Sequence, residues 1–408
     1  MFDHVIRNAR LPDHAAPVDI GFAAGRIAAI EASLPGDAPE TDAEGRLCCA
    51  GFVETHIHLD KSRIINRCSP AEGRNAMAVK RVAEAKKDFT VEDVIERATA
   101  TLENCIKHGT TRMRTHVEVD PGVGMRGFEG VKAVAEAYRW AIDVELCIFP
   151  QEGLTNNPGT EDLIVAGLEA GARVIGAAPG YDSDSSAQIR RIFELALAYD
   201  VDIDMHLDFG NSAEAMDTHL VCELTERHGL GGRVAIGHAT KLSTLPPAGQ
   251  IEMAKRLAGA GVAVTVLPAT DLFLMGRDQD HNVRRGVVDA NLFTAHGCRC
   301  SIATNNILNP FTPYGDCSPV RMANLHANIL QVGEHEKLAE CFAMLTSEAA
   351  ALMNLRDYGV RVGNPADVVI VDADEPALAV AEITPPLAVF KNGRRTVTRP
   401  RAELHRPD

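Results

Sequence analysis

Eight short apolar stretches recur through the middle of the chain, and segments with helical periodicity separate them. The apolar stretches are residues 47–53, 111–117, 144–149, 174–178, 201–207, 234–238, 262–267 and 299–304. Amphipathic helices are expected over residues 91–107, 130–141, 161–170, 187–199 and 251–260. Strands that alternate with helices are typical of a parallel α/β fold. Eight such units over roughly 300 residues therefore predict a closed (β/α)8 barrel of the TIM type.

The two ends of the chain have a different pattern, made of short strands joined by turns. Strands are expected over residues 5–11, 18–22 and 26–30, with a hairpin around Gly25, and again over 367–372, 387–390 and 396–397. Neither end holds enough strand to be stable alone. We therefore expect residues 1–50 and 356–408 to form one small β-sandwich domain, with the barrel, residues 51–355, inserted between them.

Polar side chains follow nearly every predicted strand of the barrel. They are His56, His58, His116, Gln151, Asp182, His206, Asp208, His238, Asp271, Asn305 and Asn306. The carboxyl ends of the strands form the active-site face of a (β/α)8 barrel. Helix N-caps would explain Asp182 or Asn306, but they do not easily explain the histidines. The pattern predicts an active site at this face.

His56 and His58 are one residue apart at the end of the first predicted strand. Residues i and i+2 of a strand point to the same face, so the two imidazoles emerge side by side. Such a pair is half of a divalent-metal site, although it can also be the ordinary polar face of a strand. His206, from the fifth strand, can converge with them. A hydrolytic site of this kind keeps one position open for a water whose pKa the metal lowers.

Other residues of this face are candidates for catalysis or support. His238, from the sixth strand, is placed to orient or deprotonate the water or to polarise a substrate. Lys61 could be a charge partner of the site, an oxyanion stabiliser, a carbamylated bridge or a solvated surface lysine. His116 ends the second strand, and we expect it to support the ligands rather than to bind the metal.

Composition limits the partners of the chain. It is 46% hydrophobic and 24% charged, as in a soluble globular protein, and no apolar run approaches the roughly 20 residues of a membrane span. The start, Met1-Phe2-Asp3-His4, does not read as a secretory signal. Ten scattered cysteines suggest reduced thiols in a cytoplasm. The net charge of −15 argues against nucleic acid and anionic membranes as partners.

Taken in order, these motifs resemble the amidohydrolase superfamily, and within it the bacterial cytosine deaminases and the isopropylammelide hydrolases. The resemblance covers nearly the whole chain and rests on Gly51 to Lys61, Arg114 to Val117, Phe149 to Gly153, Gly237-His238, Leu274 to Arg277, Arg284 to Gly286, Tyr358-Gly359 and Gly363 to Val368. It implies one zinc or iron ion held by His56, His58 and His206. It also implies a catalytic His238, a Gln151 that reads a heterocyclic substrate, and self-association.

Two residues depart from the family pattern. Asn305 stands where the family has a metal-binding aspartate that moves protons, and an amide cannot accept a proton at neutral pH. Phe209 stands where cytosine deaminases have a proton-shuttling glutamate. Asp208 or Asp271 could take over the proton transfer. Cytosine itself is therefore expected to be a poor substrate.

These observations lead to two hypotheses. The first is a metal-dependent hydrolase or deaminase that acts on a C–N bond of a small nitrogen heterocycle. Its candidate catalytic residues are His238, Asn305, Asp208 and Lys61, and its candidate substrate-binding residues are Gln151, His116, Asn306 and Asp271. The alternative is a barrel that binds a small ligand with little or no catalysis, having lost the aspartate after strand 8.

Overall fold

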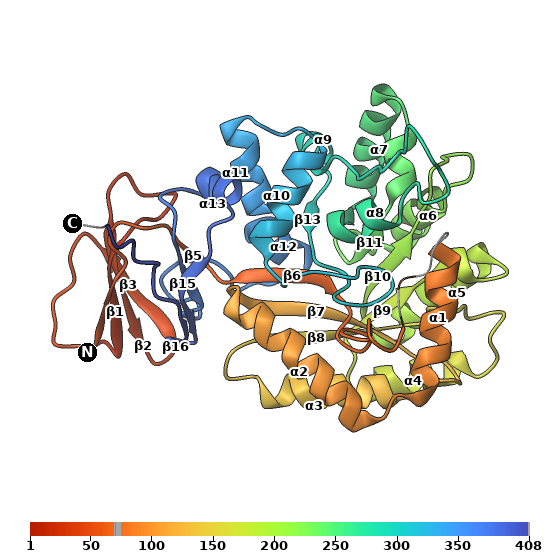
Figure 1. Cartoon of the computed structure of the whole chain (residues 1–408), viewed down its shortest axis with the longest axis horizontal. Helices are drawn as coiled ribbons and strands as arrows, with labels where there is room; N and C mark the ends of the chain where they lie inside the picture. The colour runs from red at the N-terminus through yellow and green to blue at the C-terminus, as the bar shows by residue number, and fades with distance from the viewer. Residues whose placement is uncertain (69, 71–74, 407–408) are drawn as a thin grey trace.

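The computed structural model describes residues 1–68, 70 and 75–406, and it consists of a barrel joined to a small β domain (Figure 1). The barrel sheet contains β6 (Phe52–Ile57), β7 (Thr110–Glu118), β8 (Asp143–Phe149), β9 (Val174–Ala177), β10 (Asp202–Leu207), β11 (Val234–His238), β12 (Val262–Val266) and β13 (Cys300–Ile302), all parallel and in chain order. The predicted (β/α)8 architecture is confirmed.

The barrel closes between its first and last strands, at the carboxyl end of β6. Ile57 forms a parallel bridge with Asn305, just beyond β13. The backbone N–H of His58 donates to the carbonyl of Asn305 at 2.9 Å, and the N–H of Asn305 donates to the carbonyl of His56 at 2.8 Å. The seam thus joins the backbone of two predicted metal ligands to the residue at which the family pattern is broken.

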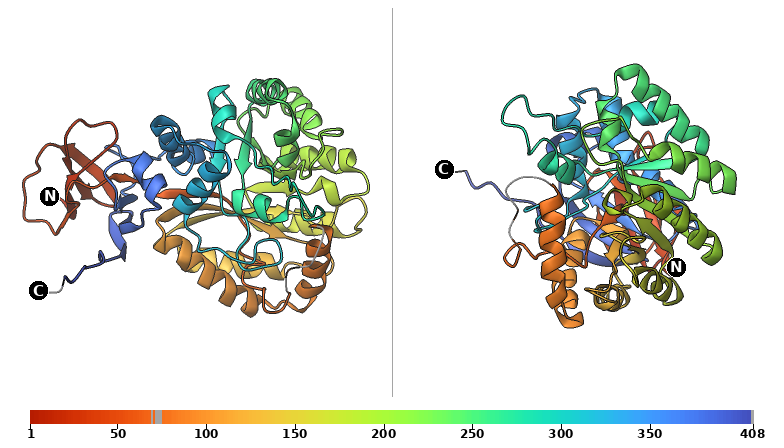
Figure 2. Two further views of the ribbon diagram at one scale, coloured as in Figure 1. Left: turned by 45° about the horizontal axis from the view of Figure 1, so that its top comes forward. Right: turned by 90° about the vertical axis from the view of Figure 1, so that its right-hand side faces the viewer.

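Helices cover the outside of the barrel (Figure 2). They include α2 (Val91–Lys107), α3 (Arg126–Ala137), α4 (Thr160–Glu169), α5 (Ser185–Tyr199), α6 (Thr218–His228), α7 (Pro247–Ala260), α9 (Ala290–Ala295), α10 (Pro319–Ile329), α11 (His335–Ala343) and α12 (Ser347–Leu352). The short, mostly buried α8 (Pro268–Leu274) follows β12 at the carboxyl end of the barrel. Side-chain caps begin several of them: Thr90 accepts from the N–H of Asp93, and Asp184 from that of Ala187. The helix predicted over 130–141 lies about four residues earlier, at Arg126–Ala137. It ends at Ala137, and Tyr138 is its C-cap.

The single strand predicted over residues 47–53 was wrong. Its first part, β5 (Cys48–Ala50), pairs antiparallel with β14 (Val368–Val371) in the small domain, and the barrel strand β6 begins only at Phe52. Gly51 separates the two strands. A Cβ at Gly51 would lie 2.0 Å from Oγ1 of Thr111, so only glycine fits where the chain passes from one sheet to the other.

The small domain is a sandwich of two four-stranded sheets. One sheet has the order β3 (Arg26–Glu31), β2 (Val18–Ala23), β1 (His4–Ala9), β4 (Glu40–Asp42). The other has the order β16 (Arg394–Thr398), β15 (Pro386–Lys391), β14, β5. They share a buried core that includes Ile6, Phe22, Val368 and Phe390. The composite β-sandwich predicted from both ends is confirmed, and we propose the division into residues 1–50 with 356–408 and 51–355.

The two domains meet at a buried lysine. Nζ of Lys391, on β15, donates to Asp143 at 2.7 Å and to Asp367 at 2.6 Å, and Arg112 on β7 pairs with the same two carboxylates. Helix α13 (Pro376–Glu382) lies against α10 and α11 of the barrel. The junction is therefore held by charge pairs as well as by packing. Within the described residues, no helix is both long enough and apolar enough to cross a membrane.

Candidate active site

The side chains of His56, His58 and His206 converge at the carboxyl end of the barrel. Nε2 of His206 lies 3.1 Å from Nε2 of His56 and 3.0 Å from Nε2 of His58. Burial lowers the pKa of His56 to about 3 and lowers the pKa values of His58 and His206 well below their usual range. The three imidazoles are therefore neutral, as metal ligands must be.

The spacing of the three histidines fits a divalent metal ion. Tetrahedral ligands about 2.0 Å from a zinc ion lie roughly 3.3 Å apart, which is close to the separations found here. The Nδ1 atoms of all three histidines are buried without a hydrogen-bond partner among the described residues, and their Nε2 atoms are turned toward one another. An all-imidazole set suits zinc or iron, and the residues fit such an ion.

Asp204, two residues before His206 on β10, lies behind the ligands. Its carboxylate is 3.8 Å from Nδ1 of His56 and 3.5 Å from Nε2 of His116, and it accepts a hydrogen bond from Arg114 at 2.9 Å. The His116 ring stacks on His56 with 3.7 Å between centroids. His116 is not among the described residues that line the cavity, and its position favours support of a ligand over contact with substrate.

His238 forms a pair with Asp271 beside the three histidines. Nδ1 of His238 lies 2.5 Å from Asp271 Oδ1, and the carboxylate is fully buried on α8. An ionised carboxylate can only accept, so Nδ1 carries a hydrogen. Asn305 Nδ2 is 3.4 Å from Nε2 of His238, which leaves Asn305 Oδ1 buried and without a partner in the described part of the chain.

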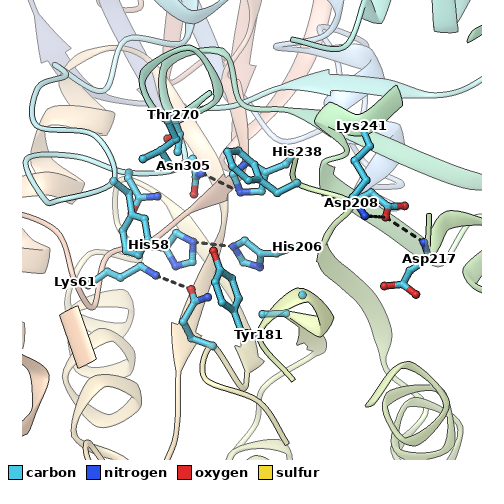
Figure 3. A pocket seen from close by; sticks show the side chains of 17 residues that line it. His58, Lys61, Tyr181, His206, Asp208, Asp217, His238, Lys241, Thr270 and Asn305 are labelled. Carbon is cyan, nitrogen blue, oxygen red and sulfur yellow. Dashed lines mark hydrogen bonds and ion pairs between the residues drawn. The ribbon is translucent and has the colours of Figure 1, made fainter. Parts of the chain in front are cut away.

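A cavity of about 280 Å³ opens over these groups (Figure 3). Of the predicted site residues, the structure places His58, Lys61, Gln151, His206, Asp208, His238, Asn305 and Asn306 on its wall. Tyr181, Phe209, Asp217, Lys241, Thr270 and Phe311 also line it. In Figure 3, Lys61 lies on one side of His58 and His206, and Asp208, Asp217 and Lys241 lie on the other.

Lys61 is buried at the cavity wall and is not a surface residue. Its ammonium group contacts the carboxylate of Glu118 and lies 3.2 Å from Oε1 of Gln151. Glu118 also pairs with Lys86 at 3.0 Å, and Lys86 pairs in turn with Asp120 at 2.6 Å. Sequence reasoning missed Glu118 and Lys86. The available signal was a charged residue in an apolar strand for Glu118, and there was none for Lys86.

The carboxylate of Asp208 accepts hydrogen bonds from the first residue of α6 and from its N-cap. It accepts from the N–H of Asp217 at 3.0 Å and from the N–H and hydroxyl of Thr218 at 2.9 and 2.6 Å, and Lys241 lies 3.2 Å away. Asn306 also lines the cavity, and its Oδ1 accepts from Asn309 at 2.7 Å. Of the two carboxylates suggested for proton transfer, only Asp271 reaches a histidine at the centre of the site.

Comparison with known proteins gives consistent matches. The profile of the family described as "Amidohydrolase family" matches residues 128–397. The chain is 28% identical over 404 residues to N-isopropylammelide isopropyl amidohydrolase of Pseudomonas sp. (strain ADP), with 96% of each chain covered. It is 27% identical over 345 residues to pterin deaminase of Rhizobium rhizogenes, covering 84% of this chain and 78% of the relative. The structure of 5-methylcytosine deaminase from Klebsiella pneumoniae, liganded with 5-fluorocytosine, superimposes with a TM-score of 0.94 at 26% identity and covers 99% of each chain.

Proposed function

The chain belongs to the amidohydrolase family, and on this basis we propose that it is a metal-dependent hydrolase of a C–N bond in a small nitrogen heterocycle. The observation that carries the proposal is the convergence of three neutral imidazoles under a cavity lined by hydrogen-bonding side chains. The similarity to enzymes named for ammelide, pterin and 5-methylcytosine supports a heterocyclic substrate.

The metal would be held by His56, His58 and His206, and we propose zinc or iron because the donors are all imidazole nitrogens. When bound, such an ion lowers the pKa of a water toward neutrality and polarises a substrate oxygen or nitrogen. Asp204, behind His56 and within reach of Nδ1, would orient that ring. Arg114 keeps Asp204 from lying unpaired in the barrel interior.

His238 would hold and move the proton of the reaction at its Nε2 atom. Asp271 fixes the tautomer and stabilises the ring if it becomes charged. In this chain Asn305 cannot accept a proton, but it can donate Nδ2–H to His238 and so fix the direction of the ring. The Phe209 ring packs against the His238 ring in a T-shaped contact, with 5.3 Å between centroids.

Turnover by metal-loaded protein tests the proposal. Zinc, iron and manganese forms would be assayed against aminopyrimidines, aminotriazines and cyclic amides or amidines for release of ammonia or alkylamine. We expect turnover of at least one class, and a weaker reaction with cytosine than with the best substrate. His206→Ala should lose both metal and activity, whereas His238→Gln should keep the metal and lose roughly 10²–10⁴-fold in kcat. His335→Ala, on the exposed face of α11, is the control.

Asn305 in place of a carboxylate favours one alternative, a barrel that binds a small ligand without hydrolysing it. The two functions differ in metal content. Protein purified with much less than one equivalent of metal, unable to take up zinc and inactive on the whole panel, would support the binding barrel.

We also propose that the enzyme works in the cytoplasm on a free small molecule and that it associates with itself. All ten cysteines are free and buried, which suits a reducing compartment, and the net charge of −15 disfavours nucleic acid. The self-association is inferred from the family, and light scattering at micromolar concentration would measure it.

A further inference from the structure

Two lysines and two acids form a buried cluster beside the cavity. Lys61, Lys86, Glu118 and Asp120 are each no more than 3% exposed. The carboxylate of Glu118 lies between the two ammonium groups. Burial acts to raise the pKa of Glu118, but Lys61 and Lys86 outweigh it and lower the value to about 2. Glu118 is therefore ionised and holds the Lys61 ammonium in one place.

Aromatic rings confine Lys61 further. Its Nζ lies 4.8 Å from the centre of the Phe311 ring and 5.6 Å from that of Phe149. With Glu118 on another side, the ammonium has two hydrogen-bond acceptors, Glu118 and Gln151. Its third N–H has no protein acceptor in residues 1–68, 70 and 75–406, and Lys61 is part of the cavity wall.

The position of Lys61 determines how the Gln151 amide is turned. An ammonium has three donors and no acceptor, so only the carbonyl oxygen of Gln151 can lie 3.2 Å from it. The opposite orientation would set the NH2 group against a positive charge. The Gln151 carbonyl is thus occupied, and its NH2 group has no hydrogen-bond partner in the described structure. Gln151 also lines the cavity.

We propose that Lys61, positioned by Glu118, locks the Gln151 amide so that this wall offers only N–H donors to the substrate. A free glutamine could read either polarity by turning its amide. The locked pair selects a ring edge with two neighbouring acceptors, which is an oxo group beside a ring nitrogen lone pair. It rejects the edge in which an amino group replaces the oxo group, because donor would meet donor. The inference rests on the proposed function and narrows its substrate class to oxo-bearing heterocycles.

Binding of two matched probes without a hydrolysable substituent tests the proposal. The probes are 2-pyrimidinone, with adjacent oxo and ring-nitrogen acceptors, and 2-aminopyrimidine, in which an amino group replaces the oxo group. Their Kd values for the zinc-loaded protein would be measured by calorimetry. We expect 2-pyrimidinone to bind at least about tenfold more tightly, as befits hydrogen bonds with a charged donor.

Lys61→Met should bring the two Kd values to within about twofold, since the amide can then turn and pair with either edge. Glu118→Gln should reduce the preference by less, because the lysine stays but is held loosely. The matched control is Lys391→Met, which removes another buried, doubly paired lysine at the domain junction. It should leave the ratio unchanged, so a general effect of losing a buried charge would be recognised.

Three results would overturn the inference. They are equal or tighter binding of 2-aminopyrimidine by the unaltered protein, no detectable binding of 2-pyrimidinone, and a preference for 2-pyrimidinone that survives Lys61→Met. None of these depends on catalysis. The proposed hydrolase function is judged separately by product release from the substrate panel, so it can stand or fall independently of the binding ratio.

Discussion

Asn305 changes which atoms at the centre of the site can hold a proton. The carboxylate expected at this position would both neutralise a divalent ion and accept a proton. The amide does neither, and its Oδ1 is left buried without a partner while its Nδ2 faces His238. The proton-accepting capacity that remains nearby is the His238–Asp271 pair. At the scale of single residues, the chemistry of this site therefore depends on β11 and α8 rather than on β13.

Asn305→Asp is expected to hold metal more firmly. The new carboxylate would add a negative charge near three neutral ligands, and opposite charges attract strongly in a buried site. We expect metal loss to a chelator to slow by about tenfold. Asn306→Asp is the matched control, because it adds the same charge one residue away, where the side chain is bonded to Asn309. Equal slowing in both variants would mean that residue 305 does not face the metal.

His326 on α10 should make stability depend on pH. Burial lowers its pKa to about 4, and neither ring nitrogen has a partner within the described residues. As pH falls from about 6.5 to 4, the unfolded chain takes up a proton here and the folded chain does not, so the free energy of unfolding decreases by up to about 3 kcal/mol. His326→Leu should remove this decrease. Urea unfolding at pH 7, 5.5 and 4 would measure it, and parallel curves for variant and wild type would contradict it.

Sequence reasoning located the residues at the carboxyl ends of the strands better than those that support them. His56, His58, His206 and His238 could be predicted because each ends a strand of an α/β pattern. Asp204 and Glu118 lie in buried strands. Their role in the site depends on ion pairs with residues far away in the sequence, Arg114 for Asp204 and Lys86 for Glu118. A single sequence does not reveal such pairs. The hydrogen bonds that Asp208 accepts depend likewise on where α6 begins.

At the scale of elements, glycines decide how closely strands approach. Gly176 on β9 faces the barrel interior, where a Cβ would lie 2.8 Å from the backbone oxygen of Asp204 and 2.8 Å from Cβ of Phe149. Both neighbours are firmly held and belong to the strands on either side. β10 carries His206, so the spacing of β9 and β10 also sets the position of a predicted metal ligand.

Gly176→Ala should therefore destabilise the protein by about 1–3 kcal/mol, since overpacking shifts backbone in a well-packed core. It should also weaken metal retention by displacing β10. Gly259→Ala is the matched control: it lies on α7 with nothing within 4 Å of the new methyl group. There alanine should be neutral or stabilise by up to about 1 kcal/mol. Chemical denaturation and metal analysis of both variants check this, and equal effects would rule out the close approach at β9.

The elements also show why a strand boundary is hard to read from sequence. The apolar residues from Leu47 to Val53 belong to two different sheets and pack into more than one buried cluster, and apolar character alone does not separate them. Gly51 was the local signal for the break. Strands β10, β11 and β12, each of which belongs to the barrel sheet alone, were predicted to within one residue at either end.

At the scale of the whole molecule, Lys391 links the two domains through ion pairs with Asp143 and Asp367. Replacing it with methionine would leave Asp143 and Asp367 with Arg112 as their remaining cation. We expect the free energy of unfolding to fall by about 1–3 kcal/mol, less than the 3–5 kcal/mol typical of a buried pair that loses one partner, because Arg112 compensates in part. Urea unfolding followed by circular dichroism would measure the change. A variant as stable as the wild type would mean that the arginine alone holds the junction.

The pairing of β5 with β14 has a consequence for how the protein is made. Ile370, the strand partner of Cys48, is synthesised 322 positions after it in the chain. While the intervening residues are synthesised, the growing polypeptide therefore carries an apolar strand edge without its β14 partner, and unpaired strand edges favour aggregation. The backbone hydrogen bonds that close the barrel between His56 and Asn305 also form only after Asn305 has been synthesised. Expression yield should accordingly respond to the speed of synthesis and to the supply of chaperones.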